Sequence, residues 1–186
     1  SSVDMASEGQ SQDYAKQWDK WYKRDDVKVK EWHCSYSSAR HILDRYVEKS
    51  MDKDARTIIV DVGCGLSSIG LDLVHDKNIN LDNTELYLID ISTELVAELR
   101  VAHAGNESIR CVEEDCRNIK CLGDGVASIV FDKGTLDALC GDEDKIAMLR
   151  ECKRILRPGG VILSVSFGSP ARLALLESAA PALGLQ

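Results

Sequence analysis

The stretch Thr57–Leu73, TIIVDVGCGLSSIGLDL, decides the fold of this chain. Its β-branched run, Ile58–Val60, predicts a buried strand that ends on Asp61. The glycine turn Gly63–Gly65 follows, and a helix can begin at Ser67, whose hydroxyl can cap it. Because glycine lacks a Cβ and tolerates positive φ, this turn lets the backbone come close to a ligand. A strand, a glycine turn and a helix N-terminus in this order predict a nucleotide-type pocket.

Strands and helices alternate through the rest of the chain. Further strands are predicted at 85–90, 108–112, 127–131 and 161–166, the last after a sharp turn at 157–160. Helices are predicted at 13–24, 37–46, 66–75, 142–156 and 171–179, with one more between Ser92 and Gly105 and a short one after Gly134. This order predicts an α/β protein with a doubly wound, Rossmann-like, mostly parallel sheet and helices on both faces.

The domain organisation predicted from the sequence is simple. We expect a single domain over residues 13–186, a length that suits one folding unit. Residues 1–12 are expected to be a flexible N-terminus that carries the scar of an expression tag, SSVDMAS. Residues 25–30 read as a charged linker.

The composition narrows the classes of function. Of the 186 residues, 44% are hydrophobic, and the net charge of −8 disfavours DNA binding, which needs clustered Lys and Arg. The seven cysteines form no C-x-x-C pair and do not cluster with the histidines. We therefore expect reduced thiols in a cytoplasmic protein, and no metal site. No apolar run approaches the ~20 residues of a membrane span. The acidity leaves room for a basic protein partner or a small cationic ligand.

Two further patterns point to a ligand site. Acidic residues stand at or just after the ends of four predicted strands: Asp61, Asp90, Asp115 and Asp132. The carboxyl ends of parallel strands share one edge of a sheet, where ligands bind, although any one of these acids could instead cap a helix. The helix at 13–24 has one aromatic face, which predicts either packing onto the core or a lid over the ligand: Tyr14, Trp18, Trp21 and Tyr22.

Two cofactors suit a glycine turn of this kind. A nicotinamide dinucleotide needs G-x-G-x-x-G, and Ser68 stands where the third glycine belongs. S-adenosylmethionine carries no phosphate and needs close backbone approach, an acid for its ribose hydroxyls and a group for its adenine amine. Asp90 and Asp115 supply these in chain order, and an acidic rim suits a cationic sulfonium. The sequence favours S-adenosylmethionine and leaves the dinucleotide as the weaker alternative.

Five segments resemble, in order, the motifs of class I S-adenosylmethionine-dependent methyltransferases: DVGCGLSSIG, LYLIDIS, EEDCRN, VFDKGTLDAL and RILRPGGVILSVSF. The segment FDKGTLDAL, with QWDKWY and KEWHCSYSS upstream, resembles one methyltransferase-like subgroup. That subgroup contains the lysine methyltransferases of translation elongation factor 1-alpha and the methyltransferase domain associated with endothelin-converting enzyme 2. The resemblance runs from about Tyr14 to Leu176. It implies an enzyme of EC class 2.1.1 that methylates a protein lysine, with a translation factor as a candidate substrate, and releases S-adenosylhomocysteine.

The resemblance also implies which residues bind the cofactor. They are Trp18, Tyr22, Asp61, Gly63, Cys64, Gly65, Asp90, Ile91, Asp115, Cys116 and Asp132. The glycine turn would hold the methionine part and Asp90 the ribose, while Asp115 would take the adenine amine. The two aromatic residues of the helix at 13–24 would close over the cofactor.

Asp132 and Lys133 are the candidate catalytic residues, because the resemblance implies that both lie near the transferable methyl. Methyl transfer is a direct displacement, so positioning can supply much of the catalysis. A lysine amine, with an ordinary pKa of about 10.4, must first lose a proton. Asp132 could orient the acceptor and Lys133 could assist that proton loss. Equally, Asp132 could only hold its own loop, and Lys133 could be solvated.

Two features depart from the family pattern. Leu66 stands where the subgroup commonly has a polar residue, so one cofactor contact is expected to be lost. The family adds a sixth and seventh strand as an antiparallel hairpin, and there is no room for both before Gln186. We therefore expect either a chain truncated after the fifth strand or a substrate lip that is built differently. Three other functions stay open: a small-molecule methyltransferase of the same fold, a non-catalytic S-adenosylmethionine-binding partner protein, and a nicotinamide-dependent oxidoreductase.

Overall fold

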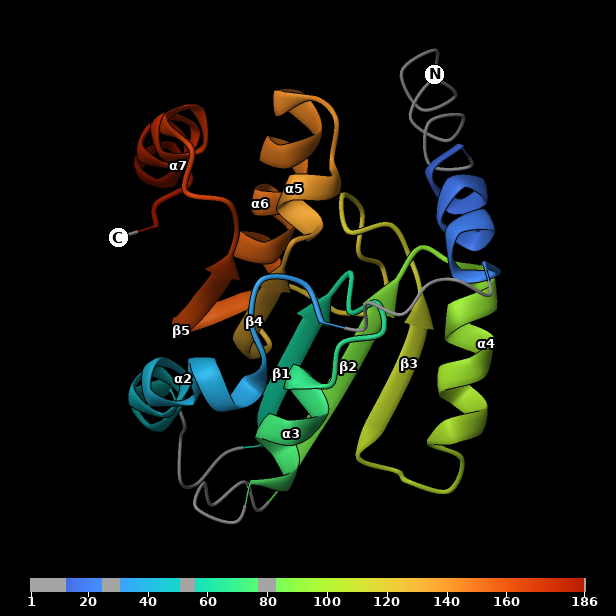
Figure 1. Cartoon of the computed structure of the whole chain (residues 1–186). Helices are drawn as coiled ribbons and strands as arrows, with labels where there is room; N and C mark the ends of the chain where they lie inside the picture. The colour runs from blue at the N-terminus through green and yellow to red at the C-terminus, as the bar shows by residue number, and fades with distance from the viewer. Residues whose placement is uncertain (1–12, 25–30, 51–55, 77–82, 186) are drawn as a thin grey trace.

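The computed structural model describes residues 13–24, 31–50, 56–76 and 83–185. One sheet has the order β3-β2-β1-β4-β5, with these strands: β1 (Thr57–Val62), β2 (Thr84–Asp90), β3 (Ile109–Glu113), β4 (Ala127–Lys133) and β5 (Leu156–Val165). Every neighbouring pair of strands is parallel. The parallel Rossmann-like sheet predicted from the sequence is therefore confirmed (Figure 1).

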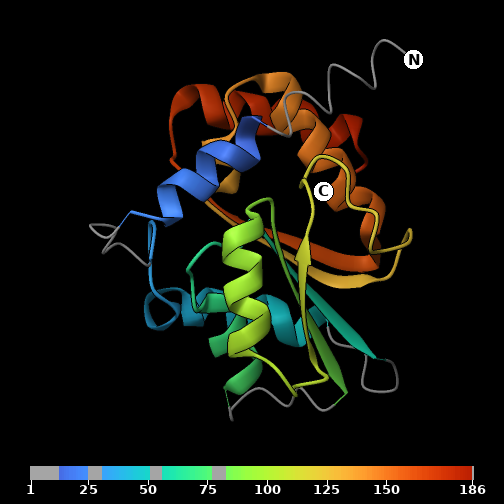
Figure 2. The ribbon, with the colours of Figure 1, turned by 90° about the vertical axis from the view of Figure 1, so that its right-hand side faces the viewer.

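Helices cover both faces of the sheet, as predicted. One face carries α2 (Tyr36–Ser50), α3 (Ile69–His75) and α4 (Thr93–Ala102), and the other carries α5 (Thr135–Ala138), α6 (Asp142–Ile155) and α7 (Pro170–Ala182). Figure 2 shows α4 and α6 on opposite sides of the sheet. Because side chains alternate along a strand, Val130 and Phe131 of β4 enter opposite cores. All of β4 is buried, as expected of a central parallel strand.

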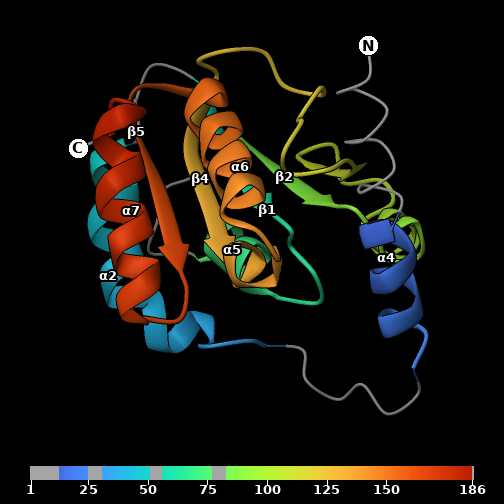
Figure 3. The ribbon, with the colours of Figure 1, turned by 90° about the horizontal axis from the view of Figure 1, so that it is seen from above.

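A helix at residues 13–22 lies outside these layers. It sits above the N-terminal end of α4, at the edge where the strands end (Figures 1 and 3). This places the aromatic face predicted for the segment beside the carboxyl ends of β1 and β2. The N-terminus predicted to be flexible at 1–12 and the charged linker predicted at 25–30 lie outside the described residues.

The helix after the glycine turn begins later than predicted. Helix α3 starts at Ile69, not at Ser67, and Ser68 as its N-cap residue makes no capping bond through its own side chain. The cause is a distant carboxylate: Glu31 accepts hydrogen bonds from the Ser68 N–H (2.8 Å) and from the Ser67 and Ser68 hydroxyls (3.1 Å each). Glu31 therefore does for α3 what a local capping residue usually does.

The prediction of a separate sharp turn at 157–160 is wrong, because these residues lie inside β5. Ala127 pairs with Leu156 and Ile129 with Val161, so two steps along β4 match five along β5. The extra residues form a bulge in which Gly159 has a φ of +76°. The described residues contain no sixth or seventh strand, and β5 leads into α7. None of their helices is long and apolar enough to cross a lipid bilayer.

Candidate functional site

The glycine turn after β1 is fixed against the start of α5. Gly63 and Gly65 have φ values of +63° and +55°, a region that glycine adopts far more readily than other residues. A Cβ at Gly63 would lie 2.1 Å from Oγ1 of Thr135. That hydroxyl lies 2.8 Å from the Val62 carbonyl and 3.1 Å from the Gly63 carbonyl, to which it can donate. The turn therefore holds one conformation and requires glycine at position 63.

Asp90, the last residue of β2, is bonded to the same turn. Its Oδ2 accepts a hydrogen bond from the Gly65 N–H (3.0 Å), and its Oδ1 accepts one from the Ser92 N–H (3.0 Å). Burial raises the pKa of Asp90, while these backbone hydrogen bonds favour its ionised form. A carboxylate oxygen has two lone pairs, so each oxygen can accept one more hydrogen bond from a ligand. Asp90 is thus suited to a pair of ribose hydroxyls.

The helix at 13–22 closes the site. Trp18, Trp21 and Tyr22 form an aromatic cluster with ring centroids 5.1 to 5.9 Å apart. Asp19 on the same helix accepts hydrogen bonds from the Ser92 hydroxyl (2.6 Å) and the Glu94 N–H (3.3 Å), which anchors the helix to the start of α4. A Cβ on Gly65 would lie 3.1 Å from the hydroxyl oxygen of Tyr22, so the aromatic cluster lies directly over the turn. Of the two interpretations that the sequence left open, this geometry favours the lid.

The start of α3 is already filled by Glu31. In a dinucleotide site this helix N-terminus binds the pyrophosphate. Here the Glu31 carboxylate accepts the Ser68 N–H, and it also pairs with the Lys133 ammonium (2.5 Å). Burial alone would raise the pKa of Glu31, but hydrogen bonds from Lys133 and Ser68 outweigh it and hold the pKa below its usual range. A pyrophosphate would have to displace this carboxylate, which argues against a nicotinamide dinucleotide.

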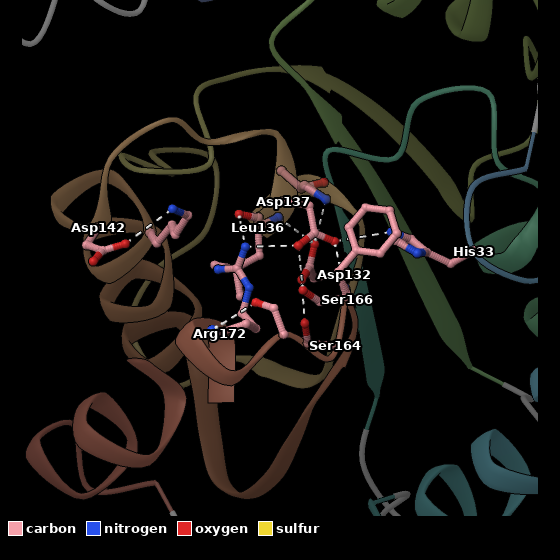
Figure 4. Close-up of polar contacts among 12 residues, drawn as sticks. His33, Asp132, Leu136, Asp137, Asp142, Ser164, Ser166 and Arg172 are labelled. Carbon is pink, nitrogen blue, oxygen red and sulfur yellow. Dashed lines mark hydrogen bonds and ion pairs between the residues drawn. The ribbon is translucent and has the colours of Figure 1, made fainter. Parts of the chain in front are cut away.

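Asp132 is the second-last residue of β4, next to the loop that follows this strand. Its Oδ1 accepts hydrogen bonds from the N–H groups of Thr135 (3.0 Å) and Leu136 (3.2 Å), and its Oδ2 accepts one from the Ser164 hydroxyl (2.6 Å) (Figure 4). Burial raises the pKa of Asp132 to about 6 in spite of these bonds. The bonding matches the interpretation in which Asp132 holds its own loop.

Lys133 and Asp61 differ in whether their charged side chains have hydrogen-bond partners. The Lys133 side chain is 2% exposed, and its ammonium donates to Glu31 and to the Trp32 carbonyl (3.0 Å), so it is not solvated. Asp61 lies within β1, and its Oδ2 has no hydrogen-bond partner among the described residues. The pKa of Asp61 is raised to about 7: burial is the largest cause, Lys133 opposes it, and the nearby Asp132 and Asp90 add to the rise.

Asp115 and Cys116 follow β3 and line the far end of the site. Asp115 faces Arg117: its Oδ2 lies 2.6 Å from Nη2, and its Oδ1 accepts the Arg117 backbone N–H (2.9 Å). Arg117 also bonds Asp144 on α6 (2.6 Å) and lies 5.0 Å from the centroid of the Tyr14 ring. Arg117 was not predicted from the sequence to be a site residue, because its ion pair with Asp144 joins two separate elements of the fold.

These parts enclose a cavity of about 330 Å³, at the lower end of the range for small-molecule sites. All the predicted site residues line it except the buried Asp61 and Asp132. Asp90, Glu114 and Asp137 are among its lining residues, while its cations Lys133 and Arg117 are each paired with a carboxylate. S-adenosylmethionine, a cation with a ribose and no phosphate, fits these residues. No group of three or more metal-ligating side chains occurs in the described part of the chain.

The residues that line the cavity but were not predicted as binding or catalytic residues include Trp32, His33, Asp137 and Phe167. His33 Nε2 lies 3.2 Å from Asp137 Oδ2, and the His33 and Phe167 rings meet edge to face at 4.6 Å. Figure 4 shows Asp137 between His33 and Arg172. His33 stands more than about a hundred positions before both Asp137 and Phe167, so no local pattern in the sequence indicates that they meet.

Comparisons with known proteins agree with this geometry. A family model described as "Methyltransferase domain" matches residues 59–160, which cover β1 to the first half of β5. Among curated proteins, the chain is 29% identical over 158 residues to the eEF1A lysine and N-terminal methyltransferase of Danio rerio, covering 83% of this chain and 21% of that protein. It is 29% identical over 166 residues to EEF1A lysine methyltransferase 4 of Mus musculus, covering 82% of this chain and 60% of that protein. The chain thus spans about a fifth of the first relative and three-fifths of the second.

Solved structures share the fold at low identity. An S-adenosylmethionine-bound amino pentose methyltransferase from Micromonospora echinaspora superposes with a TM-score of 0.58 at 18% identity, over 75% of this chain and 54% of that chain. The cyclase SpnF superposes with a TM-score of 0.55 at 19% identity, over 81% and 60%. Because one fold supports both kinds of protein, the fold does not identify the reaction. The family match spans more than half of the residues: the chain belongs to the methyltransferase domain family, with the fold of class I S-adenosylmethionine-dependent methyltransferases.

Proposed function

We propose that this chain is an S-adenosylmethionine-dependent methyltransferase that methylates a lysine side chain of a protein. The observation that carries the proposal is the cavity itself, in which Asp90 is bonded to Gly65 while Glu31 fills the position a phosphate would need. The relatives named for lysine methylation of elongation factor 1-alpha support a protein acceptor and make that translation factor the first candidate.

The mechanism follows from what each residue can bind. When bound, S-adenosylmethionine supplies a methyl group on a positively charged sulfur. Asp90 would accept hydrogen bonds from the ribose, and the Gly63–Gly65 backbone would hold the amino-acid part. Trp18 and Tyr22 exclude water, which strengthens electrostatic interactions within the cavity. Acidic residues among those that line the cavity favour a cationic ligand.

Asp132 and Lys133 act in this scheme as positioning residues. Asp132 bonds the first N–H groups of α5 and so orients Gly134, which lines the cavity. Lys133 holds the Trp32 carbonyl and the Glu31 carboxylate, and so fixes the segment at 31–33 against β4. We further propose that residues 13–186 form one domain and that the protein acts in the cytoplasm. The seven cysteines, all of them free thiols, support a reducing environment.

Methyl transfer from tritiated S-adenosylmethionine tests the proposal. The purified chain is incubated with a cell extract and, separately, with purified elongation factor 1-alpha, and labelled proteins are mapped by mass spectrometry. We expect label on a lysine of a protein and none when the chain carries Asp90→Asn. Label confined to small molecules would assign the chain to that class of acceptor instead, and cofactor binding without any labelled species would indicate a non-catalytic partner.

A further inference from the structure

The acceptor end of the cavity can be located from the order of the strands. Asp115 follows β3 and Asp90 ends β2, so the adenosine assigned to them lies over that side of the sheet. The other side, at the ends of β4 and β5, is lined by Gly134, Trp32, His33 and Phe167. The Trp32 and Phe167 side chains are 45% and 62% exposed, so this end opens to solvent between two aromatic residues.

His33 is held at this end in an unfavourable backbone conformation. Its φ is +64°, which a residue other than glycine rarely adopts. The Trp32 carbonyl accepts hydrogen bonds from the Cys34 N–H (2.7 Å) and from Lys133 Nζ (3.0 Å), which closes a three-residue turn centred on His33 and fixes it to β4. Such conformations persist only where the surroundings enforce them, and they are concentrated at functional sites.

Gly134 makes room for the imidazole. A Cβ at position 134 would lie 3.2 Å from His33 Nε2 and 3.4 Å from its Cδ2. Gly134 also has a φ of +84°, so glycine both leaves space for the imidazole and adopts the backbone conformation that this position requires. The imidazole therefore reaches the loop at the end of β4, the place where the resemblance puts the transferable methyl.

Asp137 completes the arrangement as a fixed anion. Its Oδ1 accepts hydrogen bonds from Ser166 (2.7 Å) and Arg172 (2.9 Å), and its Oδ2 accepts the Phe167 N–H (3.1 Å) and faces His33 Nε2. Burial would raise the pKa of Asp137, but these hydrogen bonds hold it below its usual value, so the carboxylate stays ionised. No hydrogen-bond partner of His33 Nδ1 exists among the described residues.

We propose that this end of the cavity receives the acceptor as an alkylammonium group between Trp32 and Phe167, and that Nδ1 of His33 removes its proton. The proposal rests on the proposed function and assigns the acceptor to the class of alkyl amines. Asp137 is the positioning residue, because its Oδ2 lies 3.2 Å from Nε2. The carboxylate favours the proton on that nitrogen, which leaves Nδ1 as the acceptor nitrogen, and it stabilises the imidazolium that forms.

The step balances as follows. One N–H bond of R–NH3+ breaks and its proton passes to neutral His33, giving R–NH2 and an imidazolium. The amine lone pair forms the N–CH3 bond while the S–CH3 bond breaks, its electron pair remaining on sulfur. The products are R–NH2+–CH3 and S-adenosylhomocysteine, and the imidazolium returns its proton to water. The charged groups that face this end are Asp137, Arg172, Lys133 and Glu31.

The substitution His33→Asn tests the role of the imidazole. Asparagine tolerates positive φ and has no basic nitrogen. The matched control is His41→Asn on the exposed surface of α2. With elongation factor 1-alpha as acceptor, we expect His33→Asn to lower kcat at pH 7 by roughly 10²-fold or more. The fall should shrink towards high pH, where more amine is already neutral. The affinity for S-adenosylhomocysteine should not change.

Nuclear magnetic resonance gives a second readout that needs no turnover. In the complex with S-adenosylhomocysteine, addition of N-α-acetyl-lysine amide should shift the imidazole signals that are missing from His33→Asn, and not those of His41. A kcat and pH profile of His33→Asn equal to those of the unaltered chain would overturn the role of His33 alone. A lack of protein methylation by the unaltered chain would instead overturn the proposed function on which this inference rests.

Discussion

The Glu31 carboxylate accepts a hydrogen bond from the Lys133 ammonium at 2.5 Å, although 102 positions separate the two residues in the chain. The same carboxylate accepts a hydrogen bond from the N–H of Ser68, the residue that precedes α3. One side chain therefore connects the segment at 31–33, the glycine-turn helix and the end of β4. The ion pair therefore holds two segments that line the cavity, 31–33 and the end of β4, against the start of α3.

Breaking the ion pair should cost more than removing both partners. Glu31→Gln leaves the ammonium of Lys133, 2% exposed, without its counter-charge, and we expect a loss of about 3 kcal/mol in the free energy of unfolding. The double variant Glu31→Gln with Lys133→Met should lose less stability than Glu31→Gln alone, and therefore less than the sum of the two single variants. Urea unfolding of all four proteins measures this coupling. Strictly additive losses would show that the ion pair does not hold the segment.

Gly63 should not tolerate alanine. The added Cβ would meet Thr135 Oγ1 at 2.1 Å, and the φ of +63° disfavours any side chain. We expect Gly63→Ala to cost roughly 2–5 kcal/mol of stability and to abolish binding of S-adenosylhomocysteine. Gly123 is the matched control, because a Cβ there meets nothing within 4 Å. Gly123→Ala should change stability by less than about 0.5 kcal/mol, and an equal effect of the two substitutions would contradict the packing described here.

Stability should fall with rising pH because of Asp61. Burial raises the pKa of this carboxyl from 3.8 to about 7, so between these values the unfolded chain has lost the proton that the folded chain keeps. The unfolded state then binds fewer protons, and stability decreases by at most about 1.4 kcal/mol per pH unit. Below about pH 4 both states are protonated and the effect vanishes. Asp61→Asn, which resembles the protonated acid, should flatten the profile of urea unfolding between about pH 4 and pH 7. The exposed Asp124→Asn serves as control, and an unchanged slope in Asp61→Asn would rule out this origin.

The lid should loosen when Asp19 is replaced. Asp19→Ala removes the acceptor of the Ser92 hydroxyl and of the Glu94 N–H, which together anchor the helix at 13–22 to α4. We expect S-adenosylhomocysteine to dissociate roughly 5- to 10-fold faster, since one or two hydrogen bonds of ordinary strength are lost. Stopped-flow tryptophan fluorescence measures the rate, because Trp18 and Trp21 line the cavity. Lys20→Ala, exposed on the same helix, should leave the rate unchanged.

The sequence predicted the parts of the site that depend on neighbouring residues. The glycine turn and Asp90 could be predicted because each stands at the end of an apolar or alternating stretch that indicates a strand. In the structure the two are joined by the Gly65–Asp90 hydrogen bond. The acids at strand ends were harder to place. Asp132 lies inside β4, because the strand continues to Lys133, and a shift of two residues is enough to move a side chain from the rim into the interior.

The parts that the sequence did not predict depend on tertiary contact. Glu31 capping α3 and His33 facing Asp137 both join a loop to an element far away in the chain. Neither pair has a spacing that sequence patterns can detect. The bulge in β5 was predicted as a turn because its glycines favour positive φ in either setting. What decides between them is the pairing of β5 with β4, which exists only in the folded sheet.

Calorimetric titration of the chain with S-adenosylhomocysteine and, separately, with NAD+ tests the central claim that this cavity binds S-adenosylmethionine through Asp90. We predict one-to-one binding of S-adenosylhomocysteine and no binding of NAD+. Asp90→Asn should weaken the affinity by roughly 10- to 100-fold, as expected for hydrogen bonds to a charged group, while Glu98→Ala, exposed on α4, should leave it unchanged. Binding of NAD+ without binding of S-adenosylhomocysteine, or an affinity that Asp90→Asn does not alter, would contradict the claim.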